Sequence, residues 1–456
     1  MTEEEKQQER TTAAAATTTT TKMKMGISYD ERMELHASIY SRHPEKPGRT
    51  RAVWKALNDH GLVSRCHFVT AREATADEIA LTHSIDYVRR VFVLEEALSP
   101  PYSQQHQQQQ RFSSTTITAA SDGVDGDGGM NKEENKEVVV ALPEIVMLRS
   151  DTYANVHTPQ AARLAVGACI GLVDAIANNT IHNGVAVVRP PGHHADRTTS
   201  MGFCLFNNAA CAAKCARTQH PTMFKRVLVV DFDVHHGNGT ESLFAGDESL
   251  MYASIHRGDR GKFYPMTGNA TSTGTNGHAV NVAWPESGVG DEDYMEAMKQ
   301  VIVPIAKEFD PSLVILSAGF DAAEGDPLGK MKVSLGCFAQ MTKEVMSIAP
   351  DGKLLMVLEG GYNEANLSAG MVNCVKALLG DDVVVEEGVQ QSSSSTTGDP
   401  QQHQHQHQET LDEVISIQSK FWTCMKTKTL PSTTHSDEIN PPSQSSSTSS
   451  ITSTTQ

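Results

Sequence analysis

The sequence lacks the features by which several classes of protein are recognised. Its eight cysteines stand at scattered single positions, with no CxxC pair and none beside a histidine at zinc-finger spacing. Such cysteines are typical of a reduced nuclear or cytosolic protein rather than a secreted one. The stretch MTEEEKQQER is acidic and polar, so we expect no secretory signal there. No apolar run approaches the ~20 residues of a membrane span, and we expect no membrane partner.

Positive charge is scarce as well. The formal net charge is -17 over 456 residues, which argues against direct binding of nucleic acid. An acidic surface favours cationic partners such as a Lys-rich tail, although acidic surfaces are common. No Lys/Arg cluster marks a nuclear address, so we expect residence in the nucleus, the cytoplasm or both.

Four stretches have too little apolar surface to offset the chain entropy lost on folding. We therefore expect disordered tails at 1–24 and 429–456, and low-complexity insertions at about 99–137 and 388–408. The His/Gln tract QHQHQHQ could bind a metal weakly but is better interpreted as a solvated linker. The remaining sequence, 25–428, is expected to form one domain of the size that large α/β enzymes reach.

Short runs of Val, Ile and Leu recur along this domain, and amphipathic stretches separate most of them. The runs are typical of strands buried on both faces, so the alternation predicts a mainly parallel central sheet flanked by helices on both faces. A last amphipathic stretch at 409–426 predicts a final helix. The expected strands are GVAVV (184–188), RVLVVDF (226–232), SLMYASI (249–255), LVILSAGF (313–320) and KLLMVLEG (353–360), and the other expected helices are 159–177, 205–217, 291–308 and 336–349.

Polar side chains follow these apolar runs. Ligands bind beyond the carboxyl ends of strands in open parallel sheets, so we expect the polar residues to gather at one site. In chain order they are His193, His194, Asp231, Asp233, His235, His236, His256, Asp321, Asp326 and Tyr362.

The stretch DFDVHH predicts a metal site. Alternate strand residues face the same side, so Asp231, Asp233 and His235 lie together. Aspartate and histidine suit zinc, and a catalytic zinc uses three protein ligands and leaves a position for water. Two ligands from this stretch and Asp321 would complete the set. Spacing leaves open whether Asp231 or Asp233 is the ligand, and the alternative is a buried carboxylate–imidazole network without metal.

Two further motifs carry groups for acid–base chemistry. The prolines and glycine of RPPGHH favour a rigid turn that would fix His193 and His194, although both could be ordinary loop histidines. A neutral imidazole can take a proton from metal-bound water and pass it to a leaving amine. In LEGGY, Tyr362 could donate a hydrogen bond to a carbonyl oxygen that becomes negative, although a structural tyrosine is the alternative.

The long motifs VVRPPGHHADRTTSMGFCLFNNAA, VVDFDVHHGNGTE, SAGFDAAEGDPLG and VLEGGYN resemble those of the zinc-dependent histone deacetylases of class II. The resemblance covers about 27–428 and implies a single arginase/deacetylase-like α/β domain. It implies hydrolysis of N-ε-acetyl-lysine on histones and other proteins, releasing acetate and lysine, with a role in chromatin and transcriptional repression. The implied partners are acetylated histone tails, other acetylated proteins and a corepressor complex.

The resemblance also implies roles for individual residues. One catalytic Zn²⁺ would be bound by Asp233, His235 and Asp321. The catalytic group would be His193 and His194 for proton transfer, Asp231 and Asn238 as their hydrogen-bond partners, and Tyr362 as the group that polarises the carbonyl. The acetyl-lysine channel would be lined by Gly202, Phe203, Tyr264, Leu328 and Gly361. A structural K⁺ would be held by the backbone at Asp231, Asp233, His235, Ser254 and Ile255.

Three positions refine these expectations. Tyr264 stands where many relatives have phenylalanine, which adds a hydroxyl near the rim. Leu328 matches the protein deacetylases, whereas the polyamine-deacetylating branch carries glutamate. Tyr362 is retained where some class II members have histidine and hydrolyse acetyl-lysine poorly, so we expect an active enzyme. The alternatives are an acetyl-lysine-binding scaffold with little activity and a deacetylase of a small acetylated metabolite.

Overall fold

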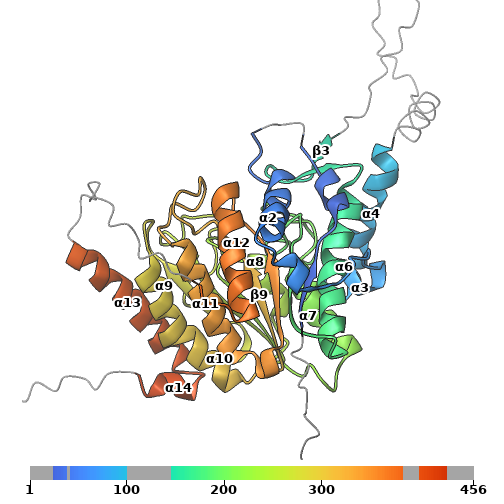
Figure 1. Cartoon of the computed structure of the whole chain (residues 1–456). Coiled ribbons are helices and arrows are strands. Elements are labelled where there is room, and N and C mark those ends of the chain that lie inside the picture. Colours follow the sequence, from blue (N-terminus) through green and yellow to red (C-terminus); the bar gives the residue numbers. More distant parts are fainter. Residues whose placement is uncertain (1–23, 39–41, 100–144, 384–399, 429–456) are drawn as a thin grey trace, which may run out of the picture.

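The computed structural model describes residues 24–38, 42–99, 145–383 and 400–428 (Figure 1). The predicted tails and the insertion at 99–137 therefore lie outside the described residues, except for two residues at their boundaries. These two residues are Lys24, which begins the first strand, and Ser99, which follows a helix.

Eight parallel strands form the central sheet in the order β2-β1-β5-β10-β9-β6-β7-β8, and a separate antiparallel pair is formed by β3 and β4. The predicted mainly parallel sheet is confirmed, and each of the five expected strands is present. Three sheet strands, β1, β2 and β8, were not predicted. The strands are β1 (Lys24–Ser28), β2 (His67–Phe68), β3 (Ile145–Met147), β4 (Tyr153–Asn155), β5 (Ile181–Ala186), β6 (Val227–Asp231), β7 (Leu250–Arg257), β8 (Ala279–Trp284), β9 (Leu313–Ala318) and β10 (Leu354–Leu358).

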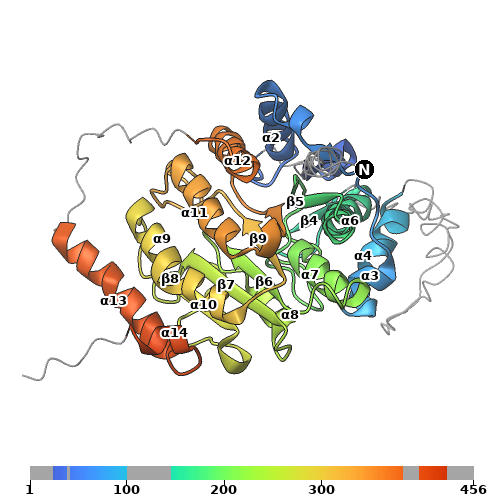
Figure 2. The same ribbon diagram turned by 60° about the horizontal axis from the view of Figure 1, so that its bottom comes forward.

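Helices cover both faces of the sheet (Figure 2). One apolar layer contains α2 and α9 to α14, the other contains α6, α7 and α8, and α3 and α4 pack outside α6. The helices are α2 (Gly48–Asp59), α3 (Ala76–Ala80), α4 (Ile85–Leu98), α6 (Thr158–Ala177), α7 (Asn208–Gln219), α8 (Asn238–Phe244), α9 (Asp291–Ala297), α10 (Val303–Phe309), α11 (Leu335–Ile348), α12 (Glu364–Leu379), α13 (Pro400–Gln418) and α14 (Thr423–Lys426).

Strand β6 explains why the apolar runs are continuous. Its residues alternate between the two layers, with Val227 and Val229 on the side of α6 and Leu228 and Val230 on the side of α11. All five positions of the strand are buried, as expected for a strand covered on both faces. Because every position is buried, the residues before the end of the strand are all apolar, and the first charged residue, Asp231, comes at its carboxyl end.

Two predicted helical segments differ in detail. The stretch 291–308 is interrupted by a π-helical turn, Met298–Ile302, between α9 and α10. The last stretch forms two helices, and α13 begins at Pro400 rather than 409. The second half of the insertion predicted at 388–408 is therefore helical, while 388–399 lies outside the described residues. Helix α12 was not predicted.

The C-terminal helices cover the edge of the sheet at β8. The amide of Gln418 donates to the carbonyl of Ala279 at 3.0 Å, and the Trp422 indole donates to the carbonyl of Gly277 at 3.1 Å. The Trp422 ring also stacks on His278, with 5.7 Å between ring centroids. A covered edge strand offers fewer unpaired backbone groups to another chain.

By length and composition alone, α6 is apolar enough to cross a membrane, with a mean hydropathy of 1.4 over its most apolar window. Arg163 and Asp174 interrupt the apolar run of this helix, so the sequence predicted no membrane span there. In the domain, 72% of that window is buried, and the helix packs against α7, β5 and the 3-10 turn Glu31–Leu35. A helix that is buried to this extent forms part of the core of the domain.

Candidate metal and catalytic site

The candidate site lies at the carboxyl ends of four neighbouring strands. Strands β5, β10, β9 and β6 are adjacent in this order, and each leads into one of the polar motifs. The parallel arrangement therefore brings together His193, Tyr362, Asp321 and Asp233, although more than 160 residues separate the first from the second. This is the position predicted for ligands in an open parallel sheet.

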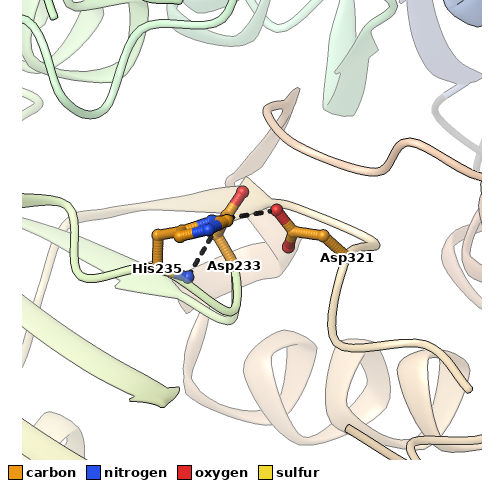
Figure 3. A group of neighbouring side chains, drawn as sticks. All are labelled: Asp233, His235 and Asp321. Atoms are coloured by element: carbon orange, nitrogen blue, oxygen red, sulfur yellow. Dashed lines mark hydrogen bonds and ion pairs between the residues drawn. The ribbon is translucent and has the colours of Figure 1, made fainter. Parts of the chain in front are cut away.

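Asp233, His235 and Asp321 form a buried cluster suited to a metal ion (Figure 3). The His235 Nδ1 atom lies 3.1 Å from Asp233 Oδ1 and 3.1 Å from Asp321 Oδ2. The second oxygen of each carboxylate is fixed by backbone, because Gly360 N–H donates to Asp233 and Val234 N–H donates to Asp321. One oxygen of each carboxylate thus faces the imidazole.

The electrostatics of this cluster fit a divalent cation. Both carboxylates are fully buried, which is costly for charged groups without compensation. Burial, followed by the charge of Asp233, raises the pKa of Asp321 to about 7. Two oxygen donors and one nitrogen donor are a set that zinc accepts while keeping a position for water. The cluster therefore fits the predicted zinc, and Asp233 rather than Asp231 belongs to it.

Asp231 instead supports the first of the tandem histidines. Its Oδ2 atom lies 3.1 Å from His193 Nδ1 and also accepts a hydrogen bond from the Tyr252 hydroxyl at 3.1 Å. Burial lowers the pKa of His193, but Asp233 and Asp231 together outweigh burial and raise it to about 10. His193 therefore favours its charged form.

His194 has the opposite electrostatic environment. Its Nδ1 atom lies 2.8 Å from the Asn238 side-chain oxygen at the start of α8. Burial, and then the neighbouring His193 and His235, hold the pKa of His194 well below its usual value. His194 is therefore neutral near pH 7 and able to accept a proton.

A model of the histone deacetylase domain matches residues 43–378. The chain belongs to the histone deacetylase family.

Individual deacetylases match most of the chain. Histone deacetylase 15 of Arabidopsis thaliana is 38% identical over 403 residues, which cover 87% of this chain and 62% of that protein. Histone deacetylase 9 of Homo sapiens is 38% identical over 371 residues, covering 78% of this chain and 34% of the relative. Histone deacetylase clr3 of Schizosaccharomyces pombe is 35% identical over 434 residues, which cover 91% of this chain and 56% of that protein. The chain thus spans less than two thirds of these class II relatives.

A solved deacetylase has the same fold. The crystal structure of the HDA15 HD domain matches with a TM-score of 0.70 and 36% identity, covering 89% of this chain and 97% of that one. The expected α/β arginase/deacetylase fold and the class II resemblance are therefore confirmed.

In this deacetylase domain, Tyr362 lies close to the predicted channel wall. Its ring meets the Phe203 ring edge-on, with 5.7 Å between centroids. Burial, and then the charge of Asp321, holds the pKa of Tyr362 well above its usual value. The phenol therefore keeps its proton and remains a hydrogen-bond donor.

The remaining predicted channel residues lie in loops around the site. The Tyr264 ring meets the His194 ring edge-on at 5.2 Å, so Tyr264 is beside the tandem histidines. Leu328 and Gly361 lie on neighbouring loops that Asp326 joins, because its two oxygens accept from the backbone of Leu328 and of Tyr362.

The backbone positions predicted for potassium lie on the adjacent strands β6 and β7 and in the loop after β6, which carries Asp233 and His235. Ser254 of β7 pairs with Asp231 of β6, and Ile255 follows it, with both residues fully buried. His256, which the sequence also singled out, bonds to the Ser254 hydroxyl at 2.9 Å and to the Gly268 carbonyl at 2.9 Å. His256 therefore anchors the loop after β7 instead of facing the cluster.

Sequence reasoning missed Glu359, which comes from the LEGGY motif itself. Its buried carboxylate accepts the backbone N–H groups of Gly192 at 2.7 Å and His193 at 3.1 Å. Arg49 binds the backbone carbonyls of Glu359 and Gly361 at 2.5 and 2.6 Å. These contacts hold the turn of the histidines against the strand end that leads to Tyr362.

Gly202 is a position where only glycine fits. Its φ is +56°, and an added Cβ would lie 2.3 Å from Cδ2 of His194. We expect Gly202→Ala to destabilise the fold by about 1–3 kcal/mol and to reduce activity about tenfold or more, because His194 must move. Thermal unfolding and initial rates would measure both effects.

The matched control is Gly246→Ala, at φ +84° with no atom within 4 Å of the added Cβ. It introduces similar backbone strain without the clash, so its activity at a temperature below unfolding should match the unmodified protein. Equal rates for the two variants would show that displacement of His194 does not affect activity.

Proposed function

We propose that the chain is a zinc-dependent lysine deacetylase that acts on histones and other acetylated proteins, releasing acetate and lysine. The proposal rests on one observation above others. A buried Asp233/His235/Asp321 cluster lies beside two histidines, with His193 Nε2 3.8 Å from Asp233 Oδ1 and the His194 ring 5.8 Å from the His235 ring. Membership of the deacetylase family supports it.

The side chains divide the hydrolysis among them. A zinc ion held by the cluster would supply Lewis-acid activation of water and of the acetamide carbonyl. His194, neutral and oriented by Asn238, takes the proton of the attacking water and returns it to the departing lysine amine. His193, held by Asp231, contributes positive charge beside the developing negative charge. Tyr362 donates a hydrogen bond to the carbonyl oxygen as it becomes negative.

The cofactors, substrates and cellular role that we propose follow from this function. We propose one catalytic Zn²⁺ and one structural K⁺, the latter bound by the backbone at Asp231, Asp233, His235, Ser254 and Ile255. Acetylated histone tails are the proposed main substrates, and repression of transcription within a corepressor complex is the proposed role. The proposed location is the nucleus, the cytoplasm or both.

Release of acetate from three classes of substrate tests this function. We expect the purified chain to hydrolyse an acetyl-lysine histone peptide with a kcat/KM about tenfold or more above that for an acetylpolyamine or free acetyl-lysine, because Leu328 offers no charge for a polyamine. Binding of the peptide should be measured in parallel.

Binding without acetate release would favour the scaffold, and preference for either small substrate would favour the metabolite deacetylase. A useful control is Tyr294→Phe, which removes a buried phenol that has no hydrogen-bond partner among the described residues. Its activity should equal that of the unmodified chain.

A further inference from the structure

Glu359 joins strand ends that form the candidate site. It is the first residue after β10, and its backbone N–H donates to the carbonyl of Ala318, at the end of β9, at 3.0 Å. Its side chain extends toward the loop after β5, where Oε2 accepts the N–H groups of Gly192 at 2.7 Å and His193 at 3.1 Å. One residue therefore holds the loop that leads to Tyr362 against the turn that carries the tandem histidines.

The turn of the tandem histidines is held from two sides. Its carbonyls accept backbone N–H groups, because Thr240 donates to His193 at 3.1 Å and Ala195 donates to Gly192 at 2.9 Å. The N–H groups of Gly192 and His193 point the other way, to Glu359. The backbone of the turn sets the direction of each Cα–Cβ bond, so a shift of these N–H groups would reorient both imidazoles.

The reach of the Glu359 side chain matters more than its charge. The side chain is fully buried, and its Oε1 atom has no hydrogen-bond partner in the described part of the chain. Burial raises the pKa of Glu359 to about 7, so the ionised form is disfavoured. A buried N–H group without an acceptor is also costly. The contact that offsets these costs is made by a single oxygen, placed within reach of two consecutive N–H groups.

We propose that Glu359 is a positioning residue, which holds His193 and His194 at the separation from Tyr362 that hydrolysis requires. The inference rests on the proposed deacetylase function and extends it to a residue that does not touch the substrate. The histidines and Tyr362 must meet the same acetamide group, although they come from different strand ends. A misplacement of about 1 Å can reduce a rate about 100-fold.

Two conservative substitutions separate the position of the acceptor oxygen from its charge. Glu359→Gln keeps an acceptor at the same reach without the charge, so kcat should stay within about threefold of the unmodified chain. Glu359→Asp keeps the charge but is one methylene shorter, so it cannot reach both N–H groups, and kcat should fall about tenfold or more. In both variants, KM for an acetyl-lysine peptide and zinc per chain should change less than about twofold.

Glu308 provides the matched control outside the site. Its carboxylate also accepts two consecutive backbone N–H groups, those of Thr423 and Cys424, each at 2.8 Å. Glu308→Asp and Glu308→Gln should therefore both keep the kcat of the unmodified chain. Melting temperatures of all four variants should be measured first, so that kcat is compared where every protein is folded.

The outcomes are separable from those for the deacetylase function. An unmodified chain that releases no acetate overturns the function itself. If the unmodified chain is active, an unchanged kcat in Glu359→Asp, or a lower kcat in Glu359→Gln than in Glu359→Asp, overturns the positioning role while the function stands. Failure of Glu359→Asp to fold, or a loss of zinc that matches the loss of kcat, overturns that role as well.

Discussion

Replacing Tyr362 with phenylalanine is expected to reduce kcat about 100- to 1,000-fold, with a much smaller change in KM. The phenol keeps its proton because burial and Asp321 hold its pKa high. Its hydrogen bond strengthens as the carbonyl oxygen becomes negative, so the loss falls on the transition state rather than on substrate binding. The ring, which packs on Phe203, is retained in the variant.

Zinc content and steady-state kinetics should be measured on the same preparation of Tyr362→Phe. Within the described part of the chain, the Tyr362 hydroxyl makes no hydrogen bond to Asp233, His235 or Asp321, so bound zinc should remain at the level of the unmodified chain. Tyr294→Phe again serves as the control for loss of a buried phenol. Wild-type turnover in Tyr362→Phe would remove Tyr362 from the mechanism.

The core of the fold was predictable because buried strands carry a strong local signal. The run RVLVVDF predicts β6 to within two residues, since both faces of the strand are covered. By contrast, β2 has only two residues, both exposed, and no apolar pattern marks it. The start of α13 was missed because its first turns are rich in Gln and His, and the composition favoured a linker.

The sequence predicts the site residues that a motif itself contains. It does not predict the contacts that a residue makes with groups far away in the chain. Asp233 and His235 follow one strand directly, so spacing placed them together. Glu359 acts on the N–H of His193, 166 residues away, and nothing in LEGGY specifies that contact. Asp151 likewise accepts hydrogen bonds from the Gly202 N–H and the Tyr264 hydroxyl, and only the folded chain brings these three together.

Replacing Asp321 with asparagine is expected to abolish stoichiometric zinc binding and to reduce activity on the order of 10³-fold or more, because the Lewis-acid contribution is lost. Asparagine preserves the size of the side chain and can still accept from the Val234 N–H. The change therefore removes a negative charge beside His235 with little disturbance of packing. Zinc per chain and acetate release would be measured before and after a chelator, and after zinc is added back.

In the metal-free protein, by contrast, Asp321→Asn should increase the stability of the fold. Burial and Asp233 raise the pKa of Asp321 from 3.8 to about 7 in the folded chain, so folding favours the protonated form. The stability that this group contributes is present below pH 3.8 and is lost as the pH rises to about 7. Above that pH, chelated Asp321→Asn should melt at a higher temperature than the chelated unmodified chain.

Zinc should reverse this order, because an ion that binds only the folded state stabilises the unmodified chain and not the variant. Asp351→Asn, at an exposed position paired with Lys353, is the matched control and should bind zinc normally. The decisive measurement is the melting temperature at pH 8 with zinc and with chelator for all three proteins. If Asp321→Asn melts below the unmodified chain under both conditions, the two buried carboxylates do not repel one another in the empty site, and the electrostatic case for a cation there is lost.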